Sequence, residues 1–159
     1  MNFNKKLFFQ DLFDKVKNNL NPKVDLHIHT NWTDGKNSVQ EMYEEAEKKS
    51  LDAIFFSEHS RKESGEWFIK FYNDIKNLPN KNCISIVGTE VKILNLDGDL
   101  DFNVNFKSYC ELIMASVHRF PGEQTNNIWK SKVDLKSEEI LDLEFNLMKA
   151  SLQNPLTDI

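Results

Sequence analysis

Residues 23–29 read KVDLHIH, and residues 51–59 read LDAIFFSEH. The first stretch alternates apolar and polar side chains with a period of two, which predicts a β-strand; the second is almost entirely apolar, as in a buried strand. Between them, Ser38 is followed three residues later by Glu41, the spacing of a capping box, and apolar side chains continue at helical intervals to about Ser50. A strand, a helix and a second strand in this order are typical of an α/β fold with a parallel sheet.

The rest of the chain extends this pattern in both directions. Toward the C-terminus we predict a helix with Ser64 as its N-cap, strands over residues 83–94 and 111–118, and a last helix that begins at Ser137. Toward the N-terminus, within residues 1–22, apolar side chains recur at intervals of three and four residues, which predicts an amphipathic helix. These side chains are Leu7, Phe8, Leu12, Phe13, Val16 and Leu20.

The composition limits the class of protein. The 159 residues suffice for one domain, which we expect to span residues 23–159. With 40% hydrophobic residues and a net charge of −5, the chain has material for a core and lacks the positive charge typical of nucleic-acid-binding proteins. No apolar stretch is long enough for a membrane span or a signal peptide. Cys83 and Cys110 lie in apolar runs and are expected to be buried thiols in a reducing cytoplasm.

The histidines lie at or next to the C-terminal ends of predicted strands. There are four of them: His27, His29, His59 and His118. In parallel α/β folds, sites form at that end of the sheet. Strand geometry directs His27 and His29 to the same side, roughly 7 Å apart, where both can bind one ion. Taken alone, this pair is equally well explained by two half-buried histidines.

Two acidic residues favour the metal interpretation. Asp34 follows the first strand in a Thr-Asp-Gly loop, although Asp-Gly by itself indicates a simple turn. Glu90 follows Gly88, which we expect to break the third strand, and lies in an apolar run where a lone buried carboxylate would need a partner or a metal. Six such ligands without cysteine predict a cluster for divalent zinc, manganese or iron ions.

The two arginines follow two of the histidines. Arg61 comes two residues after His59, and Arg119 directly follows His118, whereas the other basic residues are 18 lysines. A guanidinium binds phosphate through a planar fork of N–H donors, so these positions predict recognition of a phosphorylated substrate. We assign Arg119 a catalytic contact with the substrate phosphate and Arg61 a binding contact. The alternative is that each arginine pairs with a nearby carboxylate.

As a set, the segments DLHIHT with TDG, SEH, GTE and SVH resemble the motifs of the polymerase and histidinol phosphatase (PHP) family. They span residues 25–118, and the second motif usually has Asp where this chain has Glu58. The resemblance implies a distorted seven-stranded α/β barrel that holds up to three metal ions and hydrolyses phosphate esters. It also implies a division of the ligands: His27 and His29 on the first ion, Glu90 bridging to a second that takes His118, and Asp34 with His59 on a third.

After His118 the resemblance ends. Family members continue with a Gly-His-Pro segment and a late Asp-x-His pair, whereas this sequence runs through Asn154 and Pro155 to Ile159 without another histidine. A complete α/β barrel takes roughly 200–250 residues, so we expect an incomplete (β/α) barrel of the PHP type. The N-terminal helix is expected to pack Leu7, Phe8 and Leu12 on the wall or lower end of that barrel, away from the metals.

Two functions follow from these features. The first is a metal-dependent phosphoesterase that uses metal-activated water on a small phosphorylated substrate, either a histidinol-phosphatase-like monoester or a nucleotide phosphodiester. This function requires that the remaining ligands be supplied. The second is a truncated, catalytically inactive PHP-like module with a binding or regulatory role. The negative net charge disfavours a nucleic-acid partner.

Overall fold

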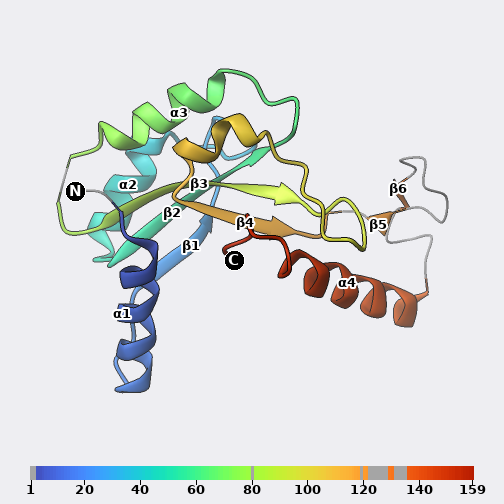
Figure 1. The fold of residues 1–159 in the computed structure, drawn as a ribbon. Coiled ribbons are helices and arrows are strands. Elements are labelled where there is room, and N and C mark those ends of the chain that lie inside the picture. The colour runs from blue at the N-terminus through green and yellow to red at the C-terminus, as the bar shows by residue number, and fades with distance from the viewer. Residues whose placement is uncertain (1–2, 80, 119, 122–128, 131–135) are drawn as a thin grey trace.

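Four parallel strands form the sheet on which the molecule is built. The computed structural model describes residues 3–79, 81–118, 120–121, 129–130 and 136–159. The sheet has the spatial order β1-β2-β3-β4 and curls into half of a barrel, with β1 and β4 at its edges (Figure 1). Its strands are β1 (Val24–Ile28), β2 (Ala53–Ser60), β3 (Ile84–Lys92) and β4 (Leu112–Ser116). The predicted α/β class, an incomplete barrel, is confirmed.

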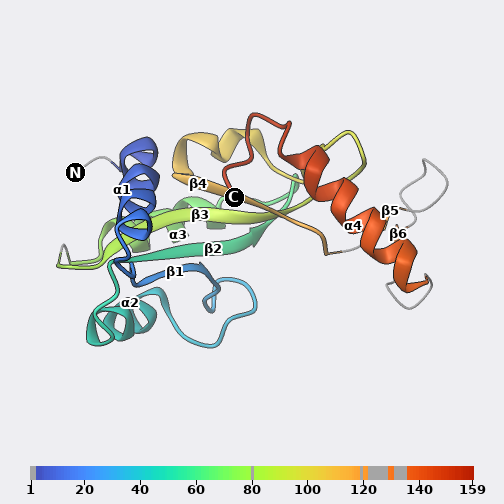
Figure 2. The same ribbon diagram turned by 90° about the horizontal axis from the view of Figure 1, so that it is seen from below.

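Helices lie on both faces of the sheet (Figures 1 and 2). Helices α2 (Val39–Lys48) and α3 (Trp67–Lys76) cover one face, and α1 (Lys5–Lys17) packs on the other. The 3-10 helix η1 (Val104–Tyr109) contacts α3, and α4 (Ser137–Ser151) contacts β4. A separate antiparallel pair consists of β5 (Phe120–Pro121) and β6 (Trp129–Lys130). None of the described helices is both long and apolar enough to span a membrane.

Alternation along the strands divides the core between the two faces. In β2, Ile54 and Phe56 belong to the cluster that α2 and α3 cover, whereas Ala53 and Phe55 belong to the cluster on which α1 packs. All four side chains are at most 2% exposed. Burial of a phenylalanine or isoleucine side chain contributes about 1.5–3 kcal/mol, so β2 stabilises both layers of the molecule.

The N-terminal helix packs at the lower end of the half-barrel, as expected, through Phe8 as predicted and through Phe9, which was not predicted. Phe8 and Phe9 pack against a cluster that includes Val24 and Ala53, the first residues of β1 and β2. Leu7, which was predicted to lie in this contact, is 65% exposed. The helix therefore lies at the end of the sheet opposite to the C-terminal ends of the strands.

Two local predictions are wrong, and both errors have a steric or hydrogen-bonding cause. Gly88 does not break β3, which is continuous from Ile84 to Lys92. A Cβ at this position would lie 1.9 Å from the carbonyl oxygen of Leu112 and 2.6 Å from the ring of Phe55, so the packing of β3 requires glycine. Ser64 does not cap α3; its hydroxyl oxygen accepts a hydrogen bond of 2.8 Å from the backbone N–H of Arg61.

Candidate metal centre

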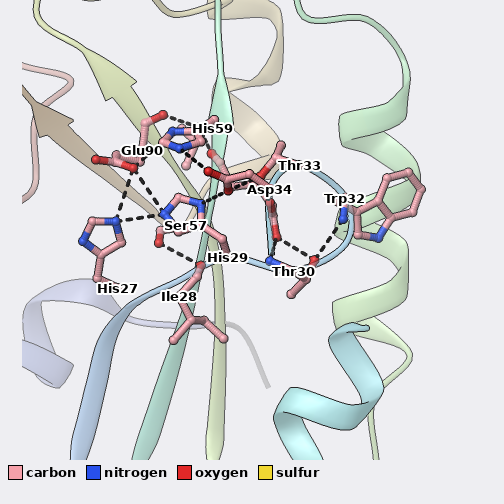
Figure 3. Close-up of polar contacts among 12 residues, drawn as sticks. His27, Ile28, His29, Thr30, Trp32, Thr33, Asp34, Ser57, His59 and Glu90 are labelled. Atoms are coloured by element: carbon pink, nitrogen blue, oxygen red, sulfur yellow. Dashed lines mark hydrogen bonds and ion pairs between the residues drawn. The ribbon is translucent and has the colours of Figure 1, made fainter. Parts of the chain in front are cut away.

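The six predicted ligands lie together at the C-terminal end of the parallel strands, and Figure 3 shows five of them: His27, His29, Asp34, His59 and Glu90. His27 lies in β1, His59 in β2 and Glu90 in β3, and the strand register places His59 directly beside Glu90. His29 follows β1, and His118 lies just beyond β4. Because the carboxyl ends of parallel strands meet at the same edge, side chains that are far apart in the sequence converge there.

Glu90 is the centre of this cluster. One carboxylate oxygen, Oε2, lies 3.2 Å from Nε2 of His27, 3.3 Å from Nε2 of His29 and 3.1 Å from Nδ1 of His59. The other oxygen, Oε1, lies 2.9 Å from Nε2 of His118. Glu90 is 3% exposed, so a single buried carboxylate contacts the imidazoles of all four histidines in the chain.

Asp34 forms a second carboxylate position on the far side of two of these rings. Its Oδ1 lies 3.5 Å from Nδ1 of His29, and its Oδ2 lies 3.4 Å from Nε2 of His59. The loop that carries Asp34 turns back sharply at Gly35, where a Cβ would lie 2.4 Å from the carbonyl oxygen of His29. Glycine at this position therefore allows the loop to return to the end of β1.

The protonation states suit binding of a cation. Burial by itself would raise the pKa of Glu90, but hydrogen bonds with His118 and Ser116 and the charges of His118 and His27 lower that pKa to about 2. Burial, together with the neighbouring His59, lowers the pKa of His29 below its ordinary value. At neutral pH Glu90 is therefore ionised and His29 is neutral, the forms in which both side chains bind metals.

The donor set fits divalent metal ions. The Nε2 atoms of His27 and His29 are 3.0 Å apart, a separation at which two lone pairs repel unless a proton or a cation lies between them. The buried Nδ1 of His29 has no hydrogen-bond partner among the described residues. Imidazoles and carboxylates without a thiolate suit zinc, manganese or iron. Three groups have ligand atoms within 4.8 Å of one another: His27, His29 and Glu90; His29, Asp34 and His59; and His59, Glu90 and His118.

The structure places one of the two arginines. Arg61 directly follows β2, is exposed, and forms no salt bridge with another described residue. The contact of Arg61 with a substrate phosphate therefore stays a prediction. Arg119 lies outside the described residues, so its contact with a substrate phosphate stays a prediction.

Sequence reasoning missed one buried carboxylate next to the cluster. Glu58 lies in β2 beside His59 and is 0% exposed. The signal that singled out Glu90, a charged residue in an otherwise apolar strand, is equally present in the segment 51–59. The carboxylate of Glu58 accepts hydrogen bonds from Thr30 and Thr33, which lie in the loop that follows β1.

Comparison with known proteins identifies a family that has this sequence pattern. The family description "PHP domain" matches residues 25–155, which include all six residues of the cluster. The chain belongs to the PHP family. It is 29% identical over 110 residues to the DNA polymerase/3'-5' exonuclease PolX of Bacillus subtilis (strain 168), a match that covers 60% of this chain and 18% of that protein.

Two further relatives of this PHP domain carry the name "probable phosphatase". One, from Thermoanaerobacter sp. (strain X514), is 29% identical over 108 residues, which cover 66% of this chain and 44% of the relative. The other, from Clostridium acetobutylicum, is 29% identical over 98 residues, which cover 60% of this chain and 40% of the relative. The matches thus span less than half the length of each of these three relatives. The resemblance to the PHP family is confirmed, and the half-barrel agrees with it.

Proposed function

We propose that this PHP domain binds divalent metal ions at the cluster around Glu90 and hydrolyses a phosphate ester of a small substrate. The observation that carries the proposal is the convergence of four imidazoles on one buried carboxylate. In a cluster that served only to stabilise the fold, a buried carboxylate would accept hydrogen bonds from donors that do not change their protonation. Here its partners are four titratable imidazoles at the C-terminal ends of the strands.

The division of ligands implied by the family resemblance is compatible with the observed groups. His29 and His59 each occur in two of the three groups, and each neutral imidazole binds one ion through one nitrogen. When His29 is assigned with His27 and Glu90, His59 remains for Asp34, and His118 shares Glu90. All six side chains are then used, with Glu90 as the bridge between two positions.

Bound metal ions would lower the pKa of a water molecule and neutralise the charge that develops on the phosphate. The residues of the chain contribute the rest. Glu90, ionised, and His29, neutral, present their lone pairs without first losing a proton at neutral pH. Arg61, and by prediction Arg119, would bind and orient the phosphate through bidentate N–H donors. No nucleophilic side chain is needed in this scheme.

The substrate class is a small phosphorylated molecule. The net charge of −5 disfavours a long polyanion, and the relatives include proteins named as phosphatases. A histidinol-phosphatase-like monoester or a nucleotide phosphodiester would fit this chemistry. We also propose that the protein acts in the cytoplasm, where the free thiols Cys83 and Cys110 would remain reduced.

The proposal can be tested with metal-free protein prepared by chelation. Zinc, manganese and iron(II) are titrated separately, the bound metal is counted by mass spectrometry of the ions, and hydrolysis of p-nitrophenyl phosphate and of bis(p-nitrophenyl) phosphate is followed. Glu90→Gln should lower both metal content and turnover. Glu47→Gln, which alters a carboxylate in α2 that contacts Cys83, is the matched control and should change neither.

The same experiment distinguishes the rival function, a non-catalytic binding or regulatory module. Metal uptake that depends on Glu90, without hydrolysis of either ester, would favour that module. If the wild-type protein took up none of the three metals, the metal-dependent phosphoesterase would be excluded for this chain.

A further inference from the structure

We propose that Glu58 is a positioning residue that fixes the loop Thr30–Gly35 and thereby holds Asp34 beside His29 and His59. The inference rests on the proposed function in one respect, that Asp34 is a metal ligand. Glu58 itself forms no hydrogen bond or salt bridge with the six residues of the cluster. It lies in β2 directly before His59, and neighbouring residues of a strand point to opposite faces of the sheet.

The carboxylate of Glu58 is buried in a way that requires an explanation. It is 0% exposed and forms no salt bridge with a described residue. Its described hydrogen-bond partners are donors of a single loop: Oε1 accepts from the backbone N–H and from the hydroxyl of Thr30, both at 2.6 Å. Oε2 accepts from the hydroxyl of Thr33. A carboxylate without a cation is stable in the interior only when such donors satisfy it, so the loop and Glu58 depend on each other.

These contacts determine the path of the loop. Figure 3 shows Thr30 after His29 and Thr33 next to Asp34. The Glu58 carboxylate accepts hydrogen bonds from both threonines, so it holds the loop at two points. Within the loop, the backbone N–H groups of Thr33 and Gly35 donate to the carbonyl oxygen of Thr30 at 3.2 and 2.9 Å. The loop is therefore a hydrogen-bonded turn that is joined to β2 by hydrogen bonds to the Glu58 carboxylate.

The position of Asp34 depends on the hydrogen bonds between Glu58 and the loop, because the side chain of Asp34 itself forms only weak contacts. Its side chain is 65% exposed, and its contacts with His29 and His59 are 3.5 and 3.4 Å long, which is too long for strong hydrogen bonds. An exposed aspartate on a free loop would sample many positions. The anchored Thr33 next to it removes most of that freedom, in the manner of outer-shell groups that orient metal ligands.

Trp32 provides a direct reporter of the loop position. Its ring lies in a stacked arrangement with that of Trp67 of α3, with centroids 6.2 Å apart and planes inclined by 24°, and its Nε1 donates to Asp74 at 3.1 Å. Two coupled indoles produce an exciton couplet in circular dichroism. The chain has three tryptophans, so a Trp129→Phe background leaves this pair alone.

The experiment compares Glu58→Ala, Glu58→Gln, Asp34→Ala and the double variant Glu58→Ala/Asp34→Ala in that background. Glu47→Ala is the matched control, because the Glu47 carboxylate accepts backbone N–H groups of Asn82 and Cys83 at the opposite end of the sheet. The couplet, the melting temperature and the affinity for manganese are measured for each variant.

We expect Glu58→Ala to lose the couplet and to weaken manganese binding by about 10–100-fold, as outer-shell substitutions do. Glu58→Gln keeps an acceptor for Thr30 and should rescue most of both signals. The double variant should bind no more weakly than Asp34→Ala, because the two changes remove the same ligand. Glu47→Ala should lower the melting temperature and leave the couplet and the affinity unchanged.

A folded Glu58→Ala protein with an intact couplet and wild-type affinity would overturn the proposal, as would additive losses in the double variant. If Glu58→Ala fails to fold, Thr33→Val removes one of the three anchoring donors and takes its place, with the same two readouts. If the wild type binds no manganese, zinc or iron, the proposed function fails, while the couplet still decides whether Glu58 positions the loop.

Discussion

At the scale of single residues, the site is built around the carboxylate of Glu90, whose two oxygens contact different histidines. Oε2 of Glu90 contacts three imidazoles, and Oε1 contacts the fourth. A carboxylate that accepts several charged or polar donors is held in its ionised form, which is the cause of its low pKa. The low pKa of Glu90 also makes the stability of the metal-free protein depend on pH.

The first prediction concerns this coupling. The folded-state pKa of Glu90 is about 2, below the ordinary value of 4.5. A lowered pKa means that ionised Glu90 stabilises the folded state above pH 4.5 and loses this contribution as the pH falls toward 2. Glu90→Gln should therefore flatten the acid decline in the free energy of unfolding, measured by urea denaturation with a chelator present. Parallel declines in wild type and variant would contradict the assigned hydrogen bonds.

A second prediction at this scale concerns the arginines. In a catalytically active form, Arg119→Ala should leave metal content and melting temperature nearly unchanged and lower the turnover of a phosphate monoester, since a charge-assisted contact of about 1.5–3 kcal/mol is lost. Arg119→Lys should rescue only partly, because an ammonium lacks the bidentate fork. His118→Ala, by contrast, should lower metal content as well as rate. Unfolding of Arg119→Ala with full specific activity in the folded fraction would instead make Arg119 a structural residue.

At the scale of elements, helix α2 begins at a capping box that the sequence shows directly. The hydroxyl of Ser38 accepts from the backbone N–H of Glu41, and the Glu41 carboxylate accepts from the backbone N–H of Ser38. The hydrogen bonds that the Glu41 carboxylate accepts from the backbone N–H and the hydroxyl of Ser38 lower the pKa of Glu41. Ser38, the N-cap of α2, lies three residues after Gly35, the last residue of the loop that carries Asp34.

The third prediction tests this cap. Ser38→Ala should reduce the free energy of unfolding by about 1 kcal/mol, because an N-cap hydrogen bond is lost. Gln40→Ala, an exposed change in the same helix, should stay within about 0.5 kcal/mol of the wild type. Both values are obtained from urea denaturation at neutral pH. Because the Glu41 pKa is lowered, the contribution of the capping box should diminish as the pH falls below the ordinary range of a carboxyl group. Equal stabilities of the two variants would contradict the capping role.

At the scale of the whole molecule, the half-barrel leaves α4 only partly packed. Leu147 is 0% exposed and belongs to the core that α2 and α3 cover. Apolar side chains elsewhere on the same helix and at its C-cap, Leu152, are between 54% and 71% exposed: Leu141, Phe145, Met148 and Leu152. In this structure α4 is therefore attached to the sheet through one narrow face.

The fourth prediction follows from this asymmetry. Leu147→Ala should destabilise the protein by about 2–5 kcal/mol, the range for removal of a fully buried leucine side chain. Leu141→Ala, on the exposed side, should change the free energy of unfolding by about 0.5 kcal/mol or less. The comparison uses urea denaturation of both variants at the same protein concentration. A larger loss for Leu141→Ala than for Leu147→Ala would mean that α4 packs with its other face.

Local sequence patterns suffice to predict the order of the elements and the end of the sheet at which the candidate ligands lie. Periodicity is a local property, so β1 and β2 could be read from alternation and apolar runs, and the histidines could be placed at their ends without knowledge of packing. The PHP motifs rest on the same short segments. The capping box at Ser38 is likewise local, and the structure confirms it.

Which residues meet depends on the packing of segments that are distant in the sequence. The register of β2 with β3 places Glu90 beside His59. The pairing of β1 with β2 brings the loop that follows β1 to Glu58, whose carboxylate accepts hydrogen bonds from Thr30. The approach of Leu112 makes Gly88 a packing requirement and not a strand break. The contacts of α1 exclude Leu7. Each of these outcomes depends on atoms from a distant segment, and no pattern within a single strand or helix contains that information.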